Sequence, residues 1–246
     1  MSKIKKIYFI LILFFVISLV QCKKSSSPAL SEHTYSINRI PVFIQQLTSN
    51  NSETKKTKII LFIKEDENLE QVRFVFEDFL NDGYSVAILK ADWGNLLTAQ
   101  LNSSEQNENI NSTCNLIKSL LEKDEQTIIM MTGELACASY YLQTDTDCSE
   151  GLILISPYCN NENLITDSNI KELFYFPTLI IVGENDEKSY NFSLQLYQKN
   201  RSLCELRSYP TDEHSFTLLY SSLHAREQIK LWIETITKKQ NKSALL

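Results

Sequence analysis

Three residues with nucleophilic side chains follow one short apolar run: Glu134 carries a carboxylate, Cys137 a thiol and Ser139 a hydroxyl. Groups of these types form covalent intermediates when a neighbouring base activates them. The run before them, 127–132, is too short for a helix, ends at Thr-Gly and leads directly into small residues that favour a helix. This pattern predicts a buried parallel strand that turns sharply into a helix packed against it.

The rest of the chain supplies the elements that must position this turn. Apolar runs of strand length alternate with segments of helical periodicity, and the stretch 102–111 is polar and predicted to be a loop. The alternation predicts an α/β fold with a mostly parallel central sheet and helices on both faces. The first predicted strand, 34–44, contains Pro41, which favours an edge position. The other predicted strands are 58–63, 84–89, 127–132, 151–157, 177–183 and 204–209, and the predicted helices are 69–80, 113–122, 190–198 and 226–237.

Four segments resemble phrases that recur in α/β hydrolases, and they come in the right order at the right spacing. Phe79–Ala87 is similar to a helix-to-strand turn of the family, and Gly151–Pro157 is similar to one of its strands. Pro177–Asp186 resembles the strand that leads to the acid residue, and Tyr209–His214 resembles the loop that carries the histidine. From about residue 58 to 236 the chain therefore resembles an α/β-hydrolase sandwich, nearest the dienelactone-hydrolase and peptidase-like branches.

The resemblance implies a catalytic triad in the chain order nucleophile, acid, histidine. Asp186 falls at the acid and His214 at the histidine, where a carboxylate would hold the imidazole as a general base. When residues 133–137 are aligned with the elbow Gly-x-Ser-x-Gly, Leu135 takes the place of the serine. Leucine has no lone pair, and loss of a triad serine costs on the order of 10⁶ in turnover. The alternative interpretation is that Asp186 and His214 are inherited structural residues.

The same alignment assigns one oxyanion-hole donor to the backbone N–H of Ala136. The second donor would come from the loop after the first central strand, which here reads Lys64-Glu65-Asp66-Glu67. Carboxylates at this place repel a developing oxyanion, and Lys64 offsets them only if it turns inward. Both departures predict a catalytically degenerate domain whose crevice above the strand ends binds a small hydrophobic ligand or a partner protein.

Three alternative nucleophiles keep a second hypothesis open. Glu134 has small residues two positions to either side, so a shift of one residue would make it a carboxylate nucleophile. Cys137 opens the predicted helix, where a thiolate is stabilised, and Ser139 lies further along the same helix. Glu134 is the best of the three. The alternative function is a divergent, serine-independent hydrolase of esters or related small substrates that uses His214 and Asp186 with Glu134 or activated water.

The N-terminus has the composition of a targeting segment. A cluster of lysines precedes an apolar stretch, 7–20, that is too short to span a membrane. Leu19–Cys22 and the polar residues after it resemble a bacterial lipobox, which implies cleavage before Cys22 and lipidation of its thiol. A doubly acylated Cys22 would hold the domain stably on a membrane of the bacterial cell envelope; an ordinary cleaved signal peptide and an uncleaved anchor are the alternatives. The predicted divisions are a signal peptide at 1–21, a lipidated cysteine and tether at 22–33, and one domain at 34–246.

Composition limits the remaining functions. A chain of 246 residues with 43% hydrophobic content can bury one sizeable core. The net charge of −6 becomes −9 once the first 21 residues, with three lysines and no acid, are removed. No basic field then attracts phosphate, which argues against nucleic acid as a partner. The spacing of the cysteines and of the three histidines matches no metal motif, so we expect neither a metal nor a cofactor.

Overall fold

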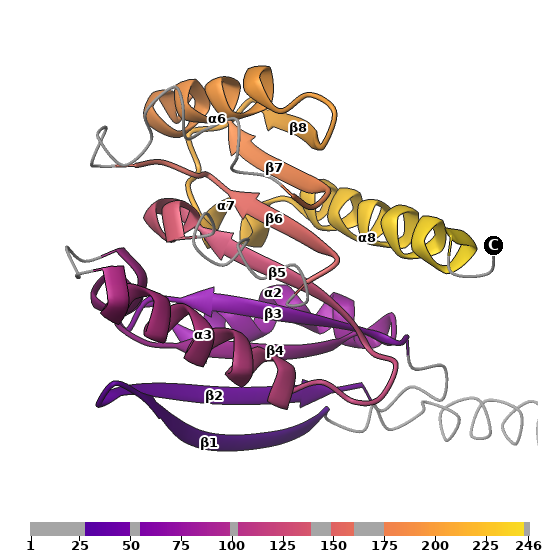
Figure 1. The fold of residues 1–246 in the computed structure, drawn as a ribbon. Coiled ribbons are helices and arrows are strands. Elements are labelled where there is room, and N and C mark those ends of the chain that lie inside the picture. The colour runs from indigo at the N-terminus through magenta and orange to yellow at the C-terminus, as the bar shows by residue number, and fades with distance from the viewer. Residues whose placement is uncertain (1–27, 50–54, 99–102, 139–148, 160–174, 244–246) are drawn as a thin grey trace, which may run out of the picture.

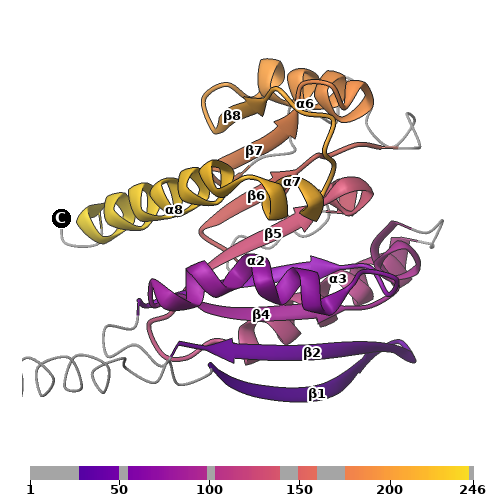
Figure 2. The same ribbon diagram turned by 180° about the vertical axis from the view of Figure 1, so that it is seen from behind.

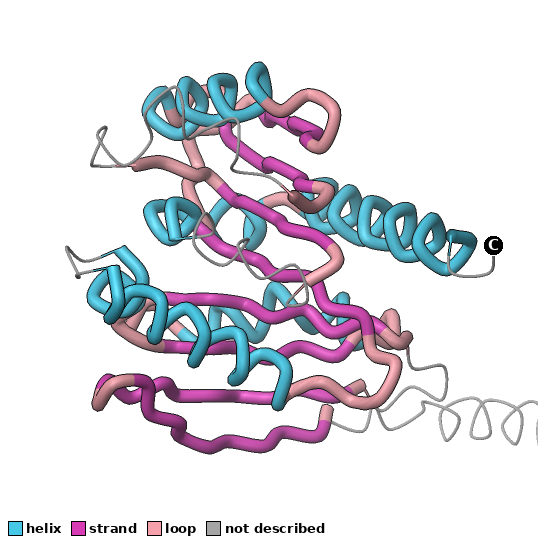
Figure 3. The backbone as a smooth tube through the Cα atoms, in the orientation of Figure 1, coloured by secondary structure: helices cyan, strands magenta, loops and turns pink. Residues whose placement is uncertain are grey.

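One central sheet lies between two layers of helices in the computed structural model (Figure 1). The structure describes residues 28–49, 55–98, 103–138, 149–159 and 175–243. Figure 3 shows how strands and helices alternate along the chain after the first two strands. Cys22, Ser139 and the predicted signal peptide lie outside the described residues. Within those ranges, no helix has the length and apolar character needed to cross a membrane.

Within the described ranges, the eight strands of the sheet follow the order β1-β2-β4-β3-β5-β6-β7-β8. β2 pairs antiparallel with both β1 and β4, and every other neighbouring pair is parallel. The prediction of a mostly parallel central sheet is therefore confirmed. The strands are β1 (Ala29–Ile37), β2 (Ile40–Thr48), β3 (Thr57–Ile63), β4 (Ser85–Lys90), β5 (Gln126–Thr132), β6 (Gly151–Ile155), β7 (Thr178–Gly183) and β8 (Cys204–Tyr209).

The N-terminal part of the sheet differs from its prediction. The single edge strand predicted at 34–44 is wrong, because the segment belongs to a hairpin of β1 and β2. Its two-residue turn, Asn38 and Arg39, has φ values of 45° and 69°, and positive φ at both central residues is typical of tight hairpins. β1 begins at Ala29, so regular structure starts five residues before the predicted domain boundary and within the predicted tether.

Burial on both faces explains why the central parallel strands are largely apolar. Every residue of β3, β6 and β7 is buried. One apolar cluster joins the sheet to α3 and α6, which lie on the near face in Figure 1. A second cluster joins the other face to α2, α7 and α8, as Figure 2 shows from behind. The prediction of helices on both faces is confirmed.

The helices are longer than their apolar periodicity predicts. α3 begins at Ser103, inside the stretch 102–111 that was predicted to be a loop, and this prediction is wrong because the first turns of α3 are exposed and need no apolar residues. The short α7 was not predicted, since six residues are too few to show a helical period. The helices are α2 (Leu69–Asn81), the π-helix η1 (Gly94–Thr98), α3 (Ser103–Ser119), the 3₁₀ helix η2 (Gly133–Ala138), α6 (Glu187–Lys199), α7 (Phe216–Ser221) and α8 (Leu223–Ser243).

Candidate functional site

Two loops meet at the carboxyl edge of the sheet and carry an acid and a histidine. Asp186 follows β7, and His214 lies in the loop after β8. The two loops are joined by backbone hydrogen bonds, among them one of 3.0 Å from the N–H of Asn185 to the carbonyl of Thr211. A β-carbon on Gly183 would lie 2.5 Å from the Thr211 oxygen, so glycine at the end of β7 permits this close approach. The parallel strands therefore fix Asp186 against His214.

The Asp186 carboxylate holds the imidazole from one side. His214 Nδ1 and Asp186 Oδ2 are 2.5 Å apart, and Ser189 Oγ lies 3.4 Å from the same ring nitrogen. Asp186 also caps α6 by accepting a hydrogen bond of 3.3 Å from the Ser189 N–H. Burial acts to raise the pKa of Asp186, but the hydrogen bonds from His214 and Ser189 outweigh it and leave the pKa lowered. An ionised Asp186 favours the tautomer in which Nδ1–H donates to the carboxylate and the lone pair lies on Nε2.

The residue that faces Nε2 is Gly133, which stands directly after β5. Its φ of 55° lies in the left-handed region that residues with a β-carbon avoid. A β-carbon on Gly133 would lie 3.4 Å from His214 Nε2 and 3.3 Å from a ring carbon of Tyr158. The nucleophile of an α/β-hydrolase elbow occupies such a strained turn at the top of the sheet. The structure thus places Gly133, and not Leu135, at the position from which a nucleophile would reach the histidine.

The Leu135 side chain is buried in the core and does not lie at the turn that faces His214. It is 3% exposed and belongs to the apolar cluster between the sheet and α3, so it is part of the core rather than a residue at the tip of the turn. The sequence alignment with Gly-x-Ser-x-Gly is therefore shifted by two residues, because the glycine that appeared to begin the motif occupies its centre. The backbone N–H after the nucleophile position then belongs to Glu134, which corrects the assignment of Ala136 as an oxyanion donor.

Glu134 faces the loop after β3. Its Oε2 lies 3.5 Å from the ammonium group of Lys64, and both side chains are partly exposed. With Leu135 and Trp93 they line a cavity of about 380 Å³ whose rim also carries Glu65, Asp66 and Asp92. Burial, followed by the charge of Asp66, raises the pKa of neighbouring Glu67. Lys64 therefore pairs with a carboxylate instead of presenting an unopposed charge at the site.

One aromatic residue, Tyr158, and one basic residue, Lys188, complete the surroundings of the imidazole, and the sequence analysis selected neither of them. The ring of Tyr158 lies 5.4 Å from that of His214. The ammonium group of Lys188 lies 4.2 Å above the centre of the Tyr158 ring. The N–H of Tyr158 donates to the carbonyl of Gly133 over 3.3 Å, which fixes the loop after β6 beside the turn after β5. The available signal was the position of Tyr158, directly after the predicted buried strand 151–157 and three residues past the end of β6.

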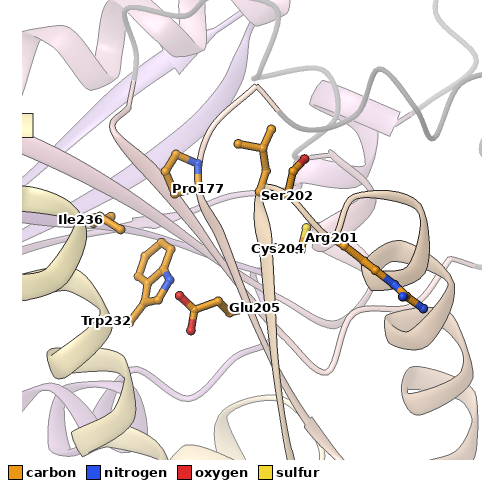
Figure 4. A pocket seen from close by; sticks show the side chains of 8 residues that line it. Pro177, Arg201, Ser202, Cys204, Glu205, Trp232 and Ile236 are labelled. Atoms are coloured by element: carbon orange, nitrogen blue, oxygen red, sulfur yellow. The ribbon is translucent and has the colours of Figure 1, made fainter. Parts of the chain in front are cut away.

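The other sequence candidates do not join this cluster in the described residues. The side chain of Cys137 and the whole of Ser139 lie outside them. Among the described residues, no three His, Cys, Asp or Glu side chains are grouped to hold a metal ion. A cavity of about 240 Å³ lies at the opposite, amino-terminal edge of the sheet, near Trp232 and Cys204 (Figure 4). Burial raises the pKa of the Cys204 thiol to about 12, so this cavity offers no thiolate nucleophile at neutral pH.

The comparisons with known proteins establish the fold. A dienelactone hydrolase from Anabaena variabilis is 13% identical, with a TM-score of 0.60 over 87% of this chain and 98% of its own. Est1E from Butyrivibrio proteoclasticus is 14% identical, with a TM-score of 0.57 over 88% of this chain and 100% of its own. A structure from a study of two fungal esterases from Rhizomucor miehei is 10% identical, with a TM-score of 0.61 over 93% of this chain and 89% of its own.

These likenesses show that the chain has the α/β-hydrolase fold, as its sequence predicts. At such low identity they show the fold alone, because this fold carries many unrelated functions. No protein-family model matches the chain, and no curated protein matches it.

Proposed function

We propose that this chain is a membrane-anchored lipoprotein whose α/β-hydrolase-like domain has lost hydrolytic chemistry and acts by binding. The observation that carries the proposal is the turn after β5, where Gly133 presents no side chain to His214 Nε2. The base and its orienting carboxylate are in place, but the residue that they would activate is glycine. No acyl-enzyme can form on a residue without a nucleophilic atom.

The remaining polar groups support binding rather than turnover. An oxyanion hole needs donors with an unopposed positive field, but Lys64 is paired with Glu134, and acidic side chains line the same rim. Leu135 and Trp93 add apolar side chains to the lining of the same cavity. Apolar walls with a few polar groups are typical of small-molecule sites. The proposed occupant is a small hydrophobic ligand or an inserted segment of a partner protein.

The anchor rests on the lipobox-like sequence around Cys22 and on the short distance from there to the fold. β1 begins at Ala29. The seven residues from Cys22 to Ala29 reach at most about 25 Å when fully extended. A lipidated Cys22 would therefore keep the hairpin of β1 and β2 close to the membrane surface and restrict the orientation of the domain.

A second candidate function is a divergent hydrolase that uses activated water. The observation in its favour is the assembled pair of Asp186 and His214, whose Nε2 faces space that a side chain would otherwise fill. Water in that space is the better nucleophile candidate, because the Glu134 carboxylate is directed toward Lys64. In this case Nε2 would take a proton from the water molecule while the water oxygen attacks the carbonyl carbon of an ester.

A panel of activated esters and epoxides, with a fluorophosphonate probe, distinguishes the two functions. We expect no turnover above that of buffer and no covalent labelling of the purified protein. A His214→Ala variant is the informative comparison, and His224→Ala serves as its control because His224 lies against Tyr209. Turnover that His214→Ala abolishes and His224→Ala preserves would refute the binding function and establish the hydrolase.

A further inference from the structure

The approach to His214 Nε2 is the one feature of the site that suggests the chemistry of its ligand. A side chain at position 133 would stand between this nitrogen and the turn after β5, at 3.4 Å from Nε2 for its β-carbon alone. Among the described residues, the atoms nearest to that β-carbon position belong to Tyr158 and His214, and Gly133 itself adds no side-chain atom there. The His214 side chain is 41% exposed, so a molecule from solution can reach the ring. Within the described residues, the hydrogen bonds of the imidazole are made by Nδ1, to Asp186 and Ser189.

The state of the imidazole selects a hydrogen-bond donor. In the tautomer that donates Nδ1–H to the carboxylate of Asp186, the lone pair lies on Nε2 and points away from that carboxylate. A carbonyl, ether or carboxylate has no proton to give to this nitrogen. A hydroxyl group has one, and its oxygen would lie about 2.8 Å from Nε2, close to where the oxygen of a serine side chain would stand.

The surroundings favour a neutral donor with an apolar body. The ammonium group of Lys188 lies over the Tyr158 ring, so a second cation against the other side of that ring would meet like charge. The Tyr158 ring carbon that lies 3.3 Å from the position of a Gly133 β-carbon provides an apolar wall beside the gap. An alcohol fits both conditions, because its hydroxyl binds Nε2 while its carbon atoms contact the ring.

We propose that the site binds a neutral alcohol whose hydroxyl donates to Nε2 of His214 in the space above Gly133 and whose apolar part packs on Tyr158. The inference rests on the proposed binding function and adds a ligand contact at His214, which is not among the residues that line the cavity beside Leu135 and Trp93. In this arrangement, the ligand supplies the hydroxyl that a serine would supply in a hydrolase. No bond is made or broken in the complex.

The test uses the full chain in detergent, labelled with ¹⁵N in its three histidines. Benzyl alcohol is the probe, and benzyl methyl ether is the matched probe that keeps the ring and the oxygen but lacks the donor. At about pH 8, benzyl alcohol should shift the Nε2 resonance of His214 and leave those of His33 and His224 unchanged. The ether should shift His214 at least about tenfold less at the same concentration, since it forms no hydrogen bond to Nε2.

A variant pair tests the position of the hydroxyl. Gly133→Ala fills the space with a methyl group and should weaken benzyl alcohol binding about tenfold or more. Gly83→Ala is its control, because Gly83 also has a positive φ, 89°, but lies in the turn between α2 and β4. An unchanged His214 resonance, or an equal response to the ether, overturns the inference even if Gly133→Ala fails to fold. The ester panel decides the proposed function separately, so the two failures remain distinct.

Discussion

Replacement of Gly133 by serine should restore a reactive hydroxyl to this fold. The β-carbon of the new residue would stand 3.4 Å from His214 Nε2, which lets the attached oxygen come within the hydrogen-bond reach of about 2.6–3.2 Å that an activated nucleophile requires. Asp186 already holds the other ring nitrogen. The variant would therefore complete the chain order nucleophile, acid, histidine with a single substitution.

The cost of the substitution follows from the backbone. A residue with a β-carbon at a φ of 55° is destabilised by about 1–2 kcal/mol, and the Tyr158 ring must move slightly because its carbon would be 3.3 Å away. For a chain of this length, such a loss lowers Tm by about 2–8 °C. The protein should remain folded.

The gain is limited by the incomplete oxyanion hole. A triad serine is worth on the order of 10⁶ in turnover, and one missing oxyanion donor removes about 10²–10³ of it. Gly133→Ser should therefore raise hydrolysis of p-nitrophenyl acetate by about 10³–10⁴ over the parent protein. It should also react with a fluorophosphonate probe, and mass spectrometry should locate the adduct on residue 133.

Leu135→Ser is the matched control, because it puts the same hydroxyl at the position that the sequence motif indicates. Leu135 is buried in the core, so this variant should neither hydrolyse the ester nor take up the probe. Adding His214→Ala to Gly133→Ser should remove the new activity. A folded Gly133→Ser variant that does not react, or labelling of Leu135→Ser instead, would refute the assignment of the turn.

Two further predictions concern acid stability and anchoring. Because the lowered pKa of Asp186 stabilises the fold above the ordinary carboxyl pKa of about 4, urea unfolding should show Asp186→Asn less stable than the parent by a constant amount above that pH. The difference should shrink as the pH falls through the lowered pKa of Asp186; a difference independent of pH would contradict the hydrogen bond to His214. Cys22→Ser should move the protein from the membrane to the soluble fraction and block its maturation, and unchanged fractionation would refute lipidation.

The sheet could be predicted because its signal is continuous burial. β3, β6 and β7 are buried on both faces by helices, so their sequences are mostly apolar and their limits differ from the predicted ones by two residues or fewer. The hairpin of β1 and β2 has no such signal, since eight of the nine residues of β1 are exposed. Its two turn residues, Asn38 and Arg39, both have positive φ values, but the pair lacks the glycine that marks a tight hairpin in a sequence.

The pairing of Asp186 with His214 could be predicted for a similar reason: each follows a strand, and parallel order brings the carboxyl ends of neighbouring strands together. The contacts of Tyr158 and Lys188 could not, because they depend on side-chain directions in the loop after β6 and in the first turn of α6, which no periodicity describes.

The sequence did not indicate that Gly133 is the residue facing His214, because a search for Gly-x-Ser-x-Gly matches a glycine to the first or last position of the motif and not to its centre. In Gly-x-Ser-x-Gly the glycines make room around a strained central residue. When the central residue is itself glycine, the strain disappears, and the small neighbours are no longer needed; Leu135 can then turn into the core, where it is 3% exposed. Under the proposed loss of hydrolytic chemistry, glycine at position 133 accounts both for the missing nucleophile and for the missing sequence pattern. Only the direction of a β-carbon, which points from Gly133 to His214 Nε2, identifies the site.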